Sequence, residues 1–357
     1  MSATPNTLLV VAPSWVGDAT MATPAFRALR TRFADARITL LCRPGIDRVL
    51  AGLPAFDATI VDRMSGAFGP LRRGVALRNA GIDCAVLFPN SFRAALAVRI
   101  AGVRVRVGYA RDGRSWLLTN GVATPPKRVP LSTVDYYCDL VERGFGVTIA
   151  DRAPSLALTD ADRSSGERVL HGVARPFAVL VPGGNRDDKR WPPDRFARVA
   201  EHLAARHGLA IVASGSPSEA AVIAELRGAC RADVVDLSTR GGDLGALKAV
   251  IAGAALVVTN DTGPRHIAAA FRVPTVALFG PTDHRWTTLR DVPERVVVAE
   301  PFLPEELVAD DRAKFCAIDR IAVGDVAARC DELLRRDARS DAPPPPSLRD
   351  DSPPPNR

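Results

Sequence analysis

The sequence lacks several patterns that would assign it to a common class of protein. It has no run of 18 or more apolar residues, so no segment has the length of a membrane-spanning helix. Its 6 cysteines form no CxxC pair and its 5 histidines form no HExxH pair, which argues against a disulfide framework and a metal site. It also lacks a GxGxxG segment, which disfavours a dehydrogenase.

The amino terminus gives no sign of export. Residues 1–6 lack the basic start and the long apolar core of a signal peptide, and Leu8–Ala12 has the composition of a strand instead. Scattered cysteines suit a reducing compartment. We therefore expect a soluble, cytoplasmic protein.

Positive charge is concentrated in the first half of the chain. Residues 1–150 hold 19 Lys and Arg against 10 Asp and Glu, whereas the rest hold 28 against 30. This imbalance favours an anionic partner for the first half, such as nucleic acid, an acidic glycan or phosphorylated lipid at a membrane surface. An arginine-rich composition without a specific partner is the alternative.

Short apolar segments alternate with amphipathic stretches, which predicts parallel sheets covered by helices. In the first half we expect strands at 7–12, 37–42, 58–62, 84–88 and 104–107. In the second half we expect them at 177–181, 209–213, 234–236, 256–259 and 275–279. Expected helices include 24–33, 194–207, 218–230, 244–252 and 264–271.

Two such series predict an α/β protein with two Rossmann-like, doubly wound domains and a ligand cleft between them. The first domain spans residues 1–150 and the second spans 151–336, with 151–158 as the connection. Residues 337–357 are rich in proline and lack apolar periodicity, so we expect a disordered tail. A proline-rich recognition segment is the alternative.

The turn after the first strand contains Asp18. An aspartate at this position can cap the next helix or face the cleft as a catalytic carboxylate. Thr23 and Pro24 offer a competing helix start, with Thr23 as the cap and Pro24 at the first helical position. We therefore expect Asp18 on a loop or a distorted first turn.

The segment after the strand at 177–181 contains Gly183, Gly184 and Asn185, followed by Lys189 and Arg190. Glycines let backbone amides approach an anion closely, and the basic pair supplies charge. A phosphate site and a solvated turn are both consistent with this pattern. Trp191 leads into an amphipathic helix, where we expect it in the core.

The strand at 256–259 runs through Asn260 into Asp261, Thr262 and Gly263, and a helix begins there. The exposed amides of that helix start, with the Thr262 hydroxyl, suit a pyrophosphate group. His266 lies on the first turn and can reach the same anion. A purely structural role for this histidine is the alternative.

Together and in this order, these segments resemble glycosyltransferase family nine, the heptosyltransferases that build the inner core of lipopolysaccharide. The resemblance covers residues 8–334 and rests on PSWVGD at 13–18, PNSF at 89–92, KRWP at 189–192, NDTG with a following His at 260–266, and GPT at 280–282. The first two motifs are more similar to type II members of the family than to type I members.

The resemblance implies a GT-B fold and an inverting, metal-independent transfer of heptose from ADP-heptose, without a cofactor. The general base of the family aligns with Asp18. Its donor-binding residues align with Lys189, Asp261, Thr262, Gly263 and His266, more loosely with Glu219, and with the loop Gly183, Gly184 and Asn185. Some members carry hydroxyl side chains in that loop, where this chain has Gly184 and Asn185.

The implied acceptor is an anionic, lipid-linked inner-core glycan, which gives the basic first half a function. We expect acceptor contacts from Asn90, Ser91, Arg93, Arg111 and Arg114. Peripheral contact with the inner face of the cytoplasmic membrane is expected, and nucleic acid is not an expected partner. A transferase or epimerase using another sugar nucleotide and a non-catalytic nucleotide-binding module are the alternatives.

Overall fold

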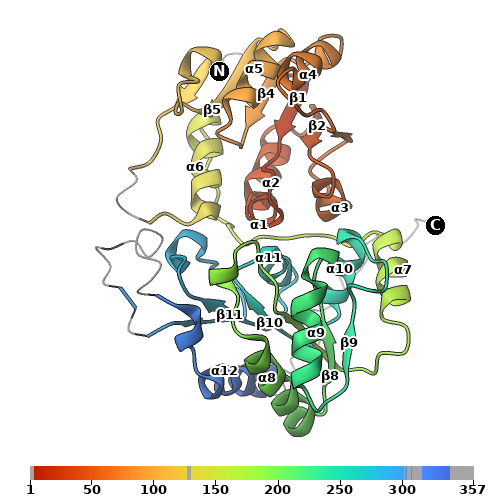
Figure 1. The fold of residues 1–357 in the computed structure, drawn as a ribbon. Coiled ribbons are helices and arrows are strands. Elements are labelled where there is room, and N and C mark those ends of the chain that lie inside the picture. The colour runs from red at the N-terminus through yellow and green to blue at the C-terminus, as the bar shows by residue number, and fades with distance from the viewer. Residues whose placement is uncertain (1–3, 127–129, 301, 304–306, 308–315, 338–357) are drawn as a thin grey trace, which may run out of the picture.

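The structure is a computed structural model that describes residues 4–126, 130–300, 302–303, 307 and 316–337. Two six-stranded parallel sheets lie one above the other in Figure 1. In spatial order the first contains β3 (Ala58–Val61), β2 (Arg37–Cys42), β1 (Thr7–Val11), β4 (Cys84–Leu87), β5 (Val105–Tyr109) and β6 (Asn120–Val122). The second contains β12 (Glu294–Val298), β11 (Thr275–Phe279), β10 (Leu256–Asn260), β7 (Phe177–Val181), β8 (Ala210–Ala213) and β9 (Val234–Asp236).

The predicted two-domain α/β fold is confirmed. All ten expected strands are present, with ends within two residues of the prediction, while β6 and β12 were not expected. The order of strands reverses between β1 and β4 in one sheet and between β7 and β10 in the other. Ligands of doubly wound sheets bind at the carboxyl ends of strands beside such reversals.

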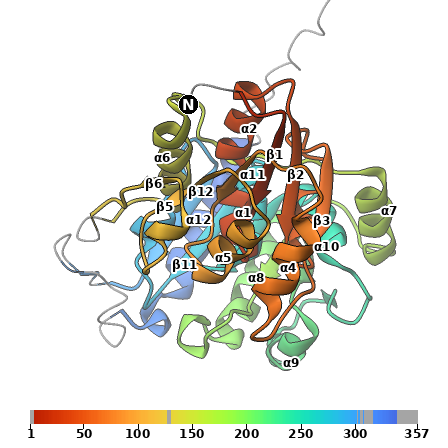
Figure 2. The same ribbon diagram turned by 90° about the horizontal axis from the view of Figure 1, so that it is seen from above.

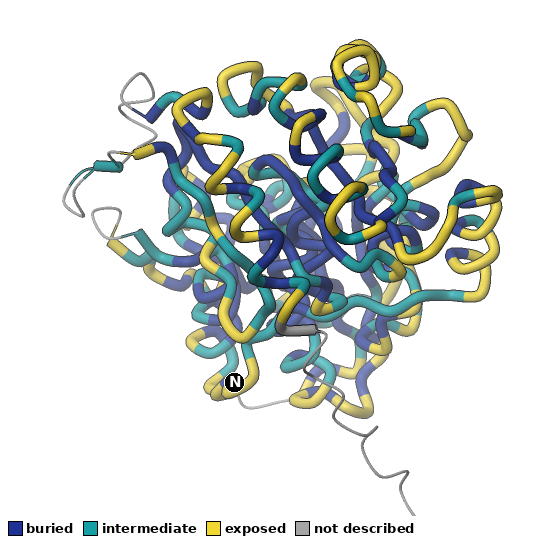
Figure 3. Tube along the Cα trace, turned by 90° about the horizontal axis from the view of Figure 1, so that it is seen from below, coloured by how far each residue is buried: buried dark blue, intermediate teal, exposed yellow. Residues whose placement is uncertain are grey.

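Helices cover both faces of each sheet. In the first domain one face carries α1 (Val16–Met21), α2 (Thr23–Arg32), α3 (Ile46–Leu50) and α6 (Thr133–Phe145), and the other carries α4 (Gly69–Leu77) and α5 (Phe92–Ile100). In the second, one face carries α8 (Pro193–His207), α9 (Ala220–Ala229) and α12 (Val323–Asp337), and the other carries α7 (Asp160–Val169), α10 (Leu244–Ala252) and α11 (Gly263–Ala270). Buried segments therefore run through the middle of the molecule, with exposed turns at its periphery (Figure 3).

The start of α2 differs from the prediction. Ala22 is its N-cap, and Pro24 takes the second helical position rather than the first. Thr23 is not the cap, because its hydroxyl donates to the carbonyl of Thr20 at 2.7 Å. The chain is therefore already helical from Val16, and it turns at Ala22 into α2.

Two pairs of helices join the domains. Along α1 and α11, a Cβ atom added to Gly17 would lie 2.6 Å from the His266 ring, and one added to Gly263 would lie 3.0 Å from Val16. Between α3 and α10, the fully buried Lys248 ammonium lies 2.9 Å from Asp162 and donates to the Ala51 carbonyl at 3.0 Å. At α1, which carries Asp18, the glycine backbone of each domain therefore packs directly against a side chain of the other domain.

No helix in the described ranges combines the length and the apolar character needed to cross a bilayer. The expected tail at 337–357 lies outside the described residues, apart from Asp337, with which α12 ends.

Candidate active site

Asp18 is the third residue of α1, so it lies on a first helical turn at the carboxyl edge of the first sheet. Its side chain is half-buried, and the Tyr137 hydroxyl of α6 donates a hydrogen bond to it. Burial raises the pKa of Asp18, the hydrogen bond from Tyr137 opposes that rise, and the negative charge of Asp261 adds to it. The result is a carboxylate of increased basicity at the domain junction.

Asp261 comes from the opposite domain, directly after β10. Its Oδ2 atom lies 3.4 Å from the Lys189 ammonium and accepts a hydrogen bond from the Thr282 hydroxyl at 3.2 Å. On the other side, Arg265 lies 3.7 Å from Oδ1. Arg265 is fully buried and binds Glu294 through two hydrogen bonds of 2.7 and 2.8 Å. The structure therefore brings Lys189, Asp261 and Asp18 to one junction.

Thr262 and Gly263 begin α11, which points its amino end into this junction. No side chain caps the helix start, and the Thr262 hydroxyl lies 3.1 Å from that of Thr259. Backbone amides at such a helix start attract anions. The phosphate-binding role of this turn stays a prediction.

His266 lies on the second domain but packs against the first. It is buried against Gly17, and its Nδ1 atom has no hydrogen-bond partner among the described residues. Burial lowers its pKa to about 3, and the neighbouring Arg265 charge adds to this effect. His266 is therefore a neutral imidazole with one unused ring nitrogen at the domain junction.

The loop after β7 is held by Asn260, which sequence reasoning did not single out as a site residue. The buried Asn260 amide donates to the Pro182 and Gly183 carbonyls at 2.9 and 3.0 Å, and its oxygen accepts from the Trp191 amide at 3.2 Å. Arg190 does not face the site as a free charge, because its guanidinium donates to the Gly184 carbonyl at 2.9 and 2.7 Å. These contacts position Lys189. Trp191 is fully buried, as predicted.

Glu219 lies against the same loop from the turn after β8. Its carboxylate accepts from the Ser216 amide at 2.7 Å, and a Cβ atom on Gly183 would lie 2.0 Å from its Oε1 atom. A glycine at 183 is therefore required for this approach. Asn185 is exposed at the outer part of the loop.

A cavity of about 420 Å³ opens beside Glu219 and the start of α11. Its apolar lining comes from Val181 and Leu237 at strand ends and from Ala246, Leu247 and Val250 on α10. Its polar lining includes Ser214, Ser238, Glu219 and Thr262. An apolar pocket with a few polar groups next to an uncapped helix start suits a small ligand that has an apolar part and an anionic part, such as a nucleotide. Glu219 and Thr262 were expected from the sequence, but no local motif indicated the apolar residues, because they come from separate segments.

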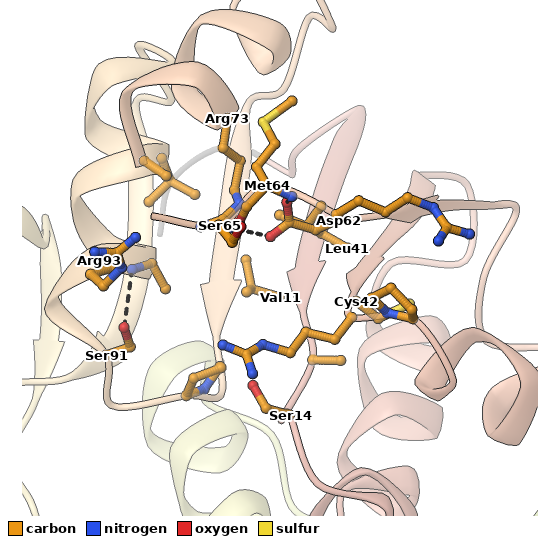
Figure 4. A pocket seen from close by; sticks show the side chains of 18 of the residues that line it. Val11, Ser14, Leu41, Cys42, Asp62, Met64, Ser65, Arg73, Ser91 and Arg93 are labelled. Atoms are coloured by element: carbon orange, nitrogen blue, oxygen red, sulfur yellow. Dashed lines mark hydrogen bonds and ion pairs between the residues drawn. The ribbon is translucent and has the colours of Figure 1, made fainter. Parts of the chain in front are cut away.

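A second cavity, of about 600 Å³, lies in the first domain at the carboxyl ends of β1 and β2 (Figure 4). Ser14, Ser91 and Arg93 line it, together with the exposed Arg43 and Arg63. Arg73 also lines it but is paired with Asp62. This cavity carries several arginines beside an apolar lining, whereas the first cavity is lined by no basic side chain and is largely apolar.

The expected acceptor residues separate into three groups. Ser91 caps α5, and Arg93 donates to the Gly66 carbonyl at the rim of the basic cavity. Asn90 and Arg111 instead gather around the hydroxyl of Tyr136, to which Asn90 donates at 3.0 Å. Tyr136 and its neighbour Tyr137 carried no signal in the sequence beyond that of an amphipathic helix.

Arg114 does not lie where we expected it. Its side chain is fully buried, and its guanidinium donates to the carbonyls of Tyr109 at 3.0 Å and Ser91 at 3.3 Å. It therefore holds the loop that carries Asn90 and Ser91, and a ligand in either cavity would not reach it directly.

Comparison with known proteins agrees with this arrangement. The model of glycosyltransferase family 9 (heptosyltransferase) matches residues 71–305. Lipopolysaccharide heptosyltransferase 2 of Escherichia coli K12 is 31% identical over 305 residues, covering 78% of this chain and 84% of that protein. Lipooligosaccharide heptosyltransferase 2 of Haemophilus influenzae is 30% identical over 298 residues, covering 78% and 85%.

Solved structures show the same fold. The structure of E. coli ADP-heptose lps heptosyltransferase II has a TM-score of 0.78 and 25% identity, covering 93% of this chain and 99% of that one. A glycosyltransferase family 9 structure from Veillonella parvula has a TM-score of 0.81 at 19% identity, covering 93% and 97%. With its fold, its junction site and these similarities, the chain belongs to glycosyltransferase family 9, the heptosyltransferases.

Proposed function

We propose that this enzyme transfers heptose from ADP-heptose to an anionic, lipid-linked inner-core glycan of lipopolysaccharide, with inversion and without a metal ion. The observation that carries the proposal is the meeting of Asp18 from the first domain with Lys189 and Asp261 from the second. The names of similar proteins support heptose as the sugar and lipopolysaccharide as the acceptor.

The proposed reaction is a single displacement at the anomeric carbon. The acceptor hydroxyl oxygen forms a bond to that carbon while the bond to the diphosphate oxygen breaks, so the configuration inverts and ADP leaves. Asp18 takes the proton from the attacking hydroxyl, and its raised pKa makes it a stronger base than an ordinary aspartate. Both bond changes occur at the junction, where the domains present donor and acceptor to each other.

In this proposal the second domain binds the donor. The nucleoside occupies the apolar cavity next to Glu219, and the diphosphate lies between the Lys189 ammonium and the Thr262–Gly263 amides. Fixed positive groups at these positions stabilise the charge that builds on the departing ADP. We assign this role to Lys189 and the helix start rather than to a metal ion.

The acceptor binds the first domain. The basic cavity of Figure 4 is large enough for a sugar unit and offers Arg43, Arg63 and Arg93 to its acidic groups. Ser14 lines the same cavity and belongs to the turn between β1 and α1, the helix that carries Asp18.

The test is a transfer assay with ADP-heptose and a deacylated inner-core acceptor. We expect Asp18→Asn to lower kcat by roughly 10²–10⁴-fold while ADP affinity is retained. We expect Lys189→Ala to weaken ADP binding by about 10-fold or more, because a charged hydrogen-bond donor is lost. Activity should survive EDTA.

Other outcomes would replace this proposal. A product formed from the donor alone indicates an epimerase, and turnover of a different sugar nucleotide changes the donor. ADP binding without turnover on any acceptor indicates a non-catalytic module. Full activity of Asp18→Asn removes Asp18 as the base.

A further inference from the structure

Exposed apolar side chains are concentrated on the first domain. Among the described residues nine large hydrophobic side chains are exposed, and all but Val296 lie before residue 117. The eight are Trp15, Ile60, Met64, Phe68, Leu71, Val75, Phe92 and Trp116. Single exposed hydrophobics are ordinary, but such a concentration on one domain marks an interaction surface.

Helix α4 presents three of these residues on one stripe. Phe68, Leu71 and Val75 follow each other at intervals of three and four, so they lie on the same side of the helix. The opposite side, Pro70, Gly74 and Leu77, is buried against the domain. Helix α4 is therefore apolar on two sides, and only one of them is explained by the fold.

Arginines border the exposed stripe. On a helix of 3.6 residues per turn, Arg72 and Arg78 project on either side of Phe68, Leu71 and Val75, and both are exposed. Long arginine side chains beside an apolar stripe are typical of helices that lie in a membrane interface, where the guanidinium reaches the lipid headgroups.

The stripe continues onto α5, which lies beside α4 in Figures 1 and 2. Arg93 of α5 donates to the Gly66 carbonyl, two residues before Phe68. Next to it, the exposed Phe92 ring packs 6.1 Å from the exposed Trp116 ring, centroid to centroid. The α4 stripe and the Phe92–Trp116 pair both lie on the side of the first sheet that α4 and α5 cover. Phe68, Leu71, Val75, Phe92 and Trp116 are here called the aromatic face.

Arginines outnumber acidic residues in the segment that carries the aromatic face. Residues 62–116 contain ten arginines and three acidic residues. Of the three, Asp62 pairs with Arg73 and Asp112 pairs with Arg111. Asp83 itself is bound to Thr7 and Arg104. Met64 and Arg93, beside this face, also line the basic cavity assigned to the acceptor. An anionic partner is therefore favoured over a protein surface of mixed charge.

We propose that the aromatic face docks the enzyme onto an anionic lipid bilayer, with Phe68, Leu71 and Val75 in the interface and Arg72 and Arg78 at the headgroups. The proposal extends the proposed function, because a docked first domain presents its basic cavity to a lipid-linked acceptor. Binding to lipid nevertheless requires neither donor nor acceptor, so an experiment can disprove one proposal without disproving the other.

The test is sedimentation of the full chain with vesicles of phosphatidylcholine alone or mixed with phosphatidylglycerol. We expect binding to the anionic vesicles, weaker binding to neutral ones, and release at high salt. The variant Phe68→Ser/Leu71→Ser/Val75→Ser should bind anionic vesicles about tenfold less tightly or worse. Val296→Ser, which removes the exposed hydrophobic of the other domain, should bind normally.

Two controls keep the outcomes distinct. The triple variant should retain its circular dichroism spectrum, its ADP affinity and its turnover on a water-soluble deacylated acceptor. Arg72→Glu/Arg78→Glu supplies a second variant without any change in the apolar stripe, and it should lose binding to anionic vesicles specifically. The proposal is overturned if the wild-type protein does not bind anionic vesicles. It is also overturned if the triple variant binds them as tightly as the wild type. The proposal is also overturned if the wild type does not bind vesicles but forms a dimer, and the triple variant is a monomer. The aromatic face would then join two copies of the chain.

Discussion

At the scale of single residues, the hydrogen bond between Tyr137 and Asp18 controls how basic the carboxylate is. Burial raises the pKa of Asp18, and the Tyr137 hydroxyl counteracts part of this rise by stabilising the ionised form. A general base works only when ionised, so activity must fall as the pH drops through the pKa of Asp18.

We therefore predict that Tyr137→Phe moves the acidic limb of the kcat/KM profile to higher pH. Removing the hydrogen bond leaves burial unopposed, and the pKa of Asp18 rises further. The measurement is the pH dependence of transfer for both proteins, with ADP affinity as the control, since Tyr137 lies on the acceptor domain. An acidic limb that stays in place or moves to lower pH would contradict this account of Asp18.

Gly183 provides a second prediction. A Cβ atom there would lie 2.0 Å from the Glu219 carboxylate, so Gly183→Ala must displace Glu219 from the cavity rim. We expect ADP affinity to fall by roughly tenfold, measured by calorimetry, because the loop and a polar group of the pocket both shift.

Gly184→Ala is the matched control for that variant, because its Cβ atom would meet its nearest neighbour at an ordinary 3.6 Å. Equal losses in the two variants would assign the effect to the backbone of the loop. An unchanged affinity of Gly183→Ala would remove Glu219 from the donor site.

The sequence located some site residues well and others poorly, for a physical reason. Asp261 directly follows β10 and Asp18 lies on the first helical turn after β1, and strand ends have a fixed place at the edge of a parallel sheet. Arg114 and Arg190 are long side chains whose guanidinium groups turned back to backbone carbonyls, and local sequence does not encode that direction. The buried Asn260 looked like part of a motif, although its role is to position the loop.

At the scale of elements, the alternation of strands and helices predicted both sheets except for one edge strand of each. Both missed strands, β6 and β12, follow the preceding strand through a short 3-10 turn instead of a full helix. β6 has only three residues, one of them glycine, so it has no periodicity to detect. β12 contains three consecutive valines, which is a strand signal, but no helix separates it from β11.

One carboxylate links α12 to α8, in addition to the apolar contacts of α12 in the core. Asp331 accepts hydrogen bonds from His202 at 2.8 Å and His207 at 2.7 Å, both on α8, and it pairs with Arg206 at 3.1 Å. Burial opposes ionisation, but the hydrogen bonds from His207 and His202 prevail and lower the pKa of Asp331. A carboxyl group with a lowered pKa stabilises the fold above its ordinary pKa and loses that contribution as the pH falls.

We predict that Asp331→Asn reduces the free energy of unfolding by about 1 kcal/mol at neutral pH, since its partners are partly exposed. The difference from the wild type should begin to shrink below about pH 4, where the carboxylate of the unfolded chain becomes protonated, and it should vanish at lower pH, below the lowered pKa of the native carboxylate. Urea unfolding at several pH values measures this. A difference that is constant over the whole range would mean that the charge of Asp331 contributes nothing.

At the scale of the whole molecule, the reaction depends on how two domains meet. Neither domain contains both the proposed base and the proposed donor site, since Asp18 lies on the first and Lys189 and Asp261 lie on the second. Their distance is set by the packing of α1 on α11, where Gly17 touches His266 and Gly263 touches Val16. Glycine allows the two helices to approach closely, and Asp18 directly follows Gly17.

We predict that Gly17→Ala separates chemistry from donor binding. Its backbone suits alanine, but the added Cβ atom would lie 2.6 Å from a buried imidazole, a clash of the kind that costs about 1–3 kcal/mol. The strain is relieved if α1 moves away from α11 and takes Asp18 with it. Transfer should therefore fall at least about tenfold, whereas ADP affinity, which depends on the second domain, should change little.

Gly228→Ala on α9 is the matched control, because a Cβ atom there meets nothing within 4 Å. It should leave transfer intact and stabilise the helix slightly, as alanine does in place of glycine. If Gly17→Ala kept full activity, α1 would have moved away from α11 without any decrease in the rate of transfer. The base would then act without a fixed position relative to the donor, and the close approach of α1 to α11 would be a feature of folding alone.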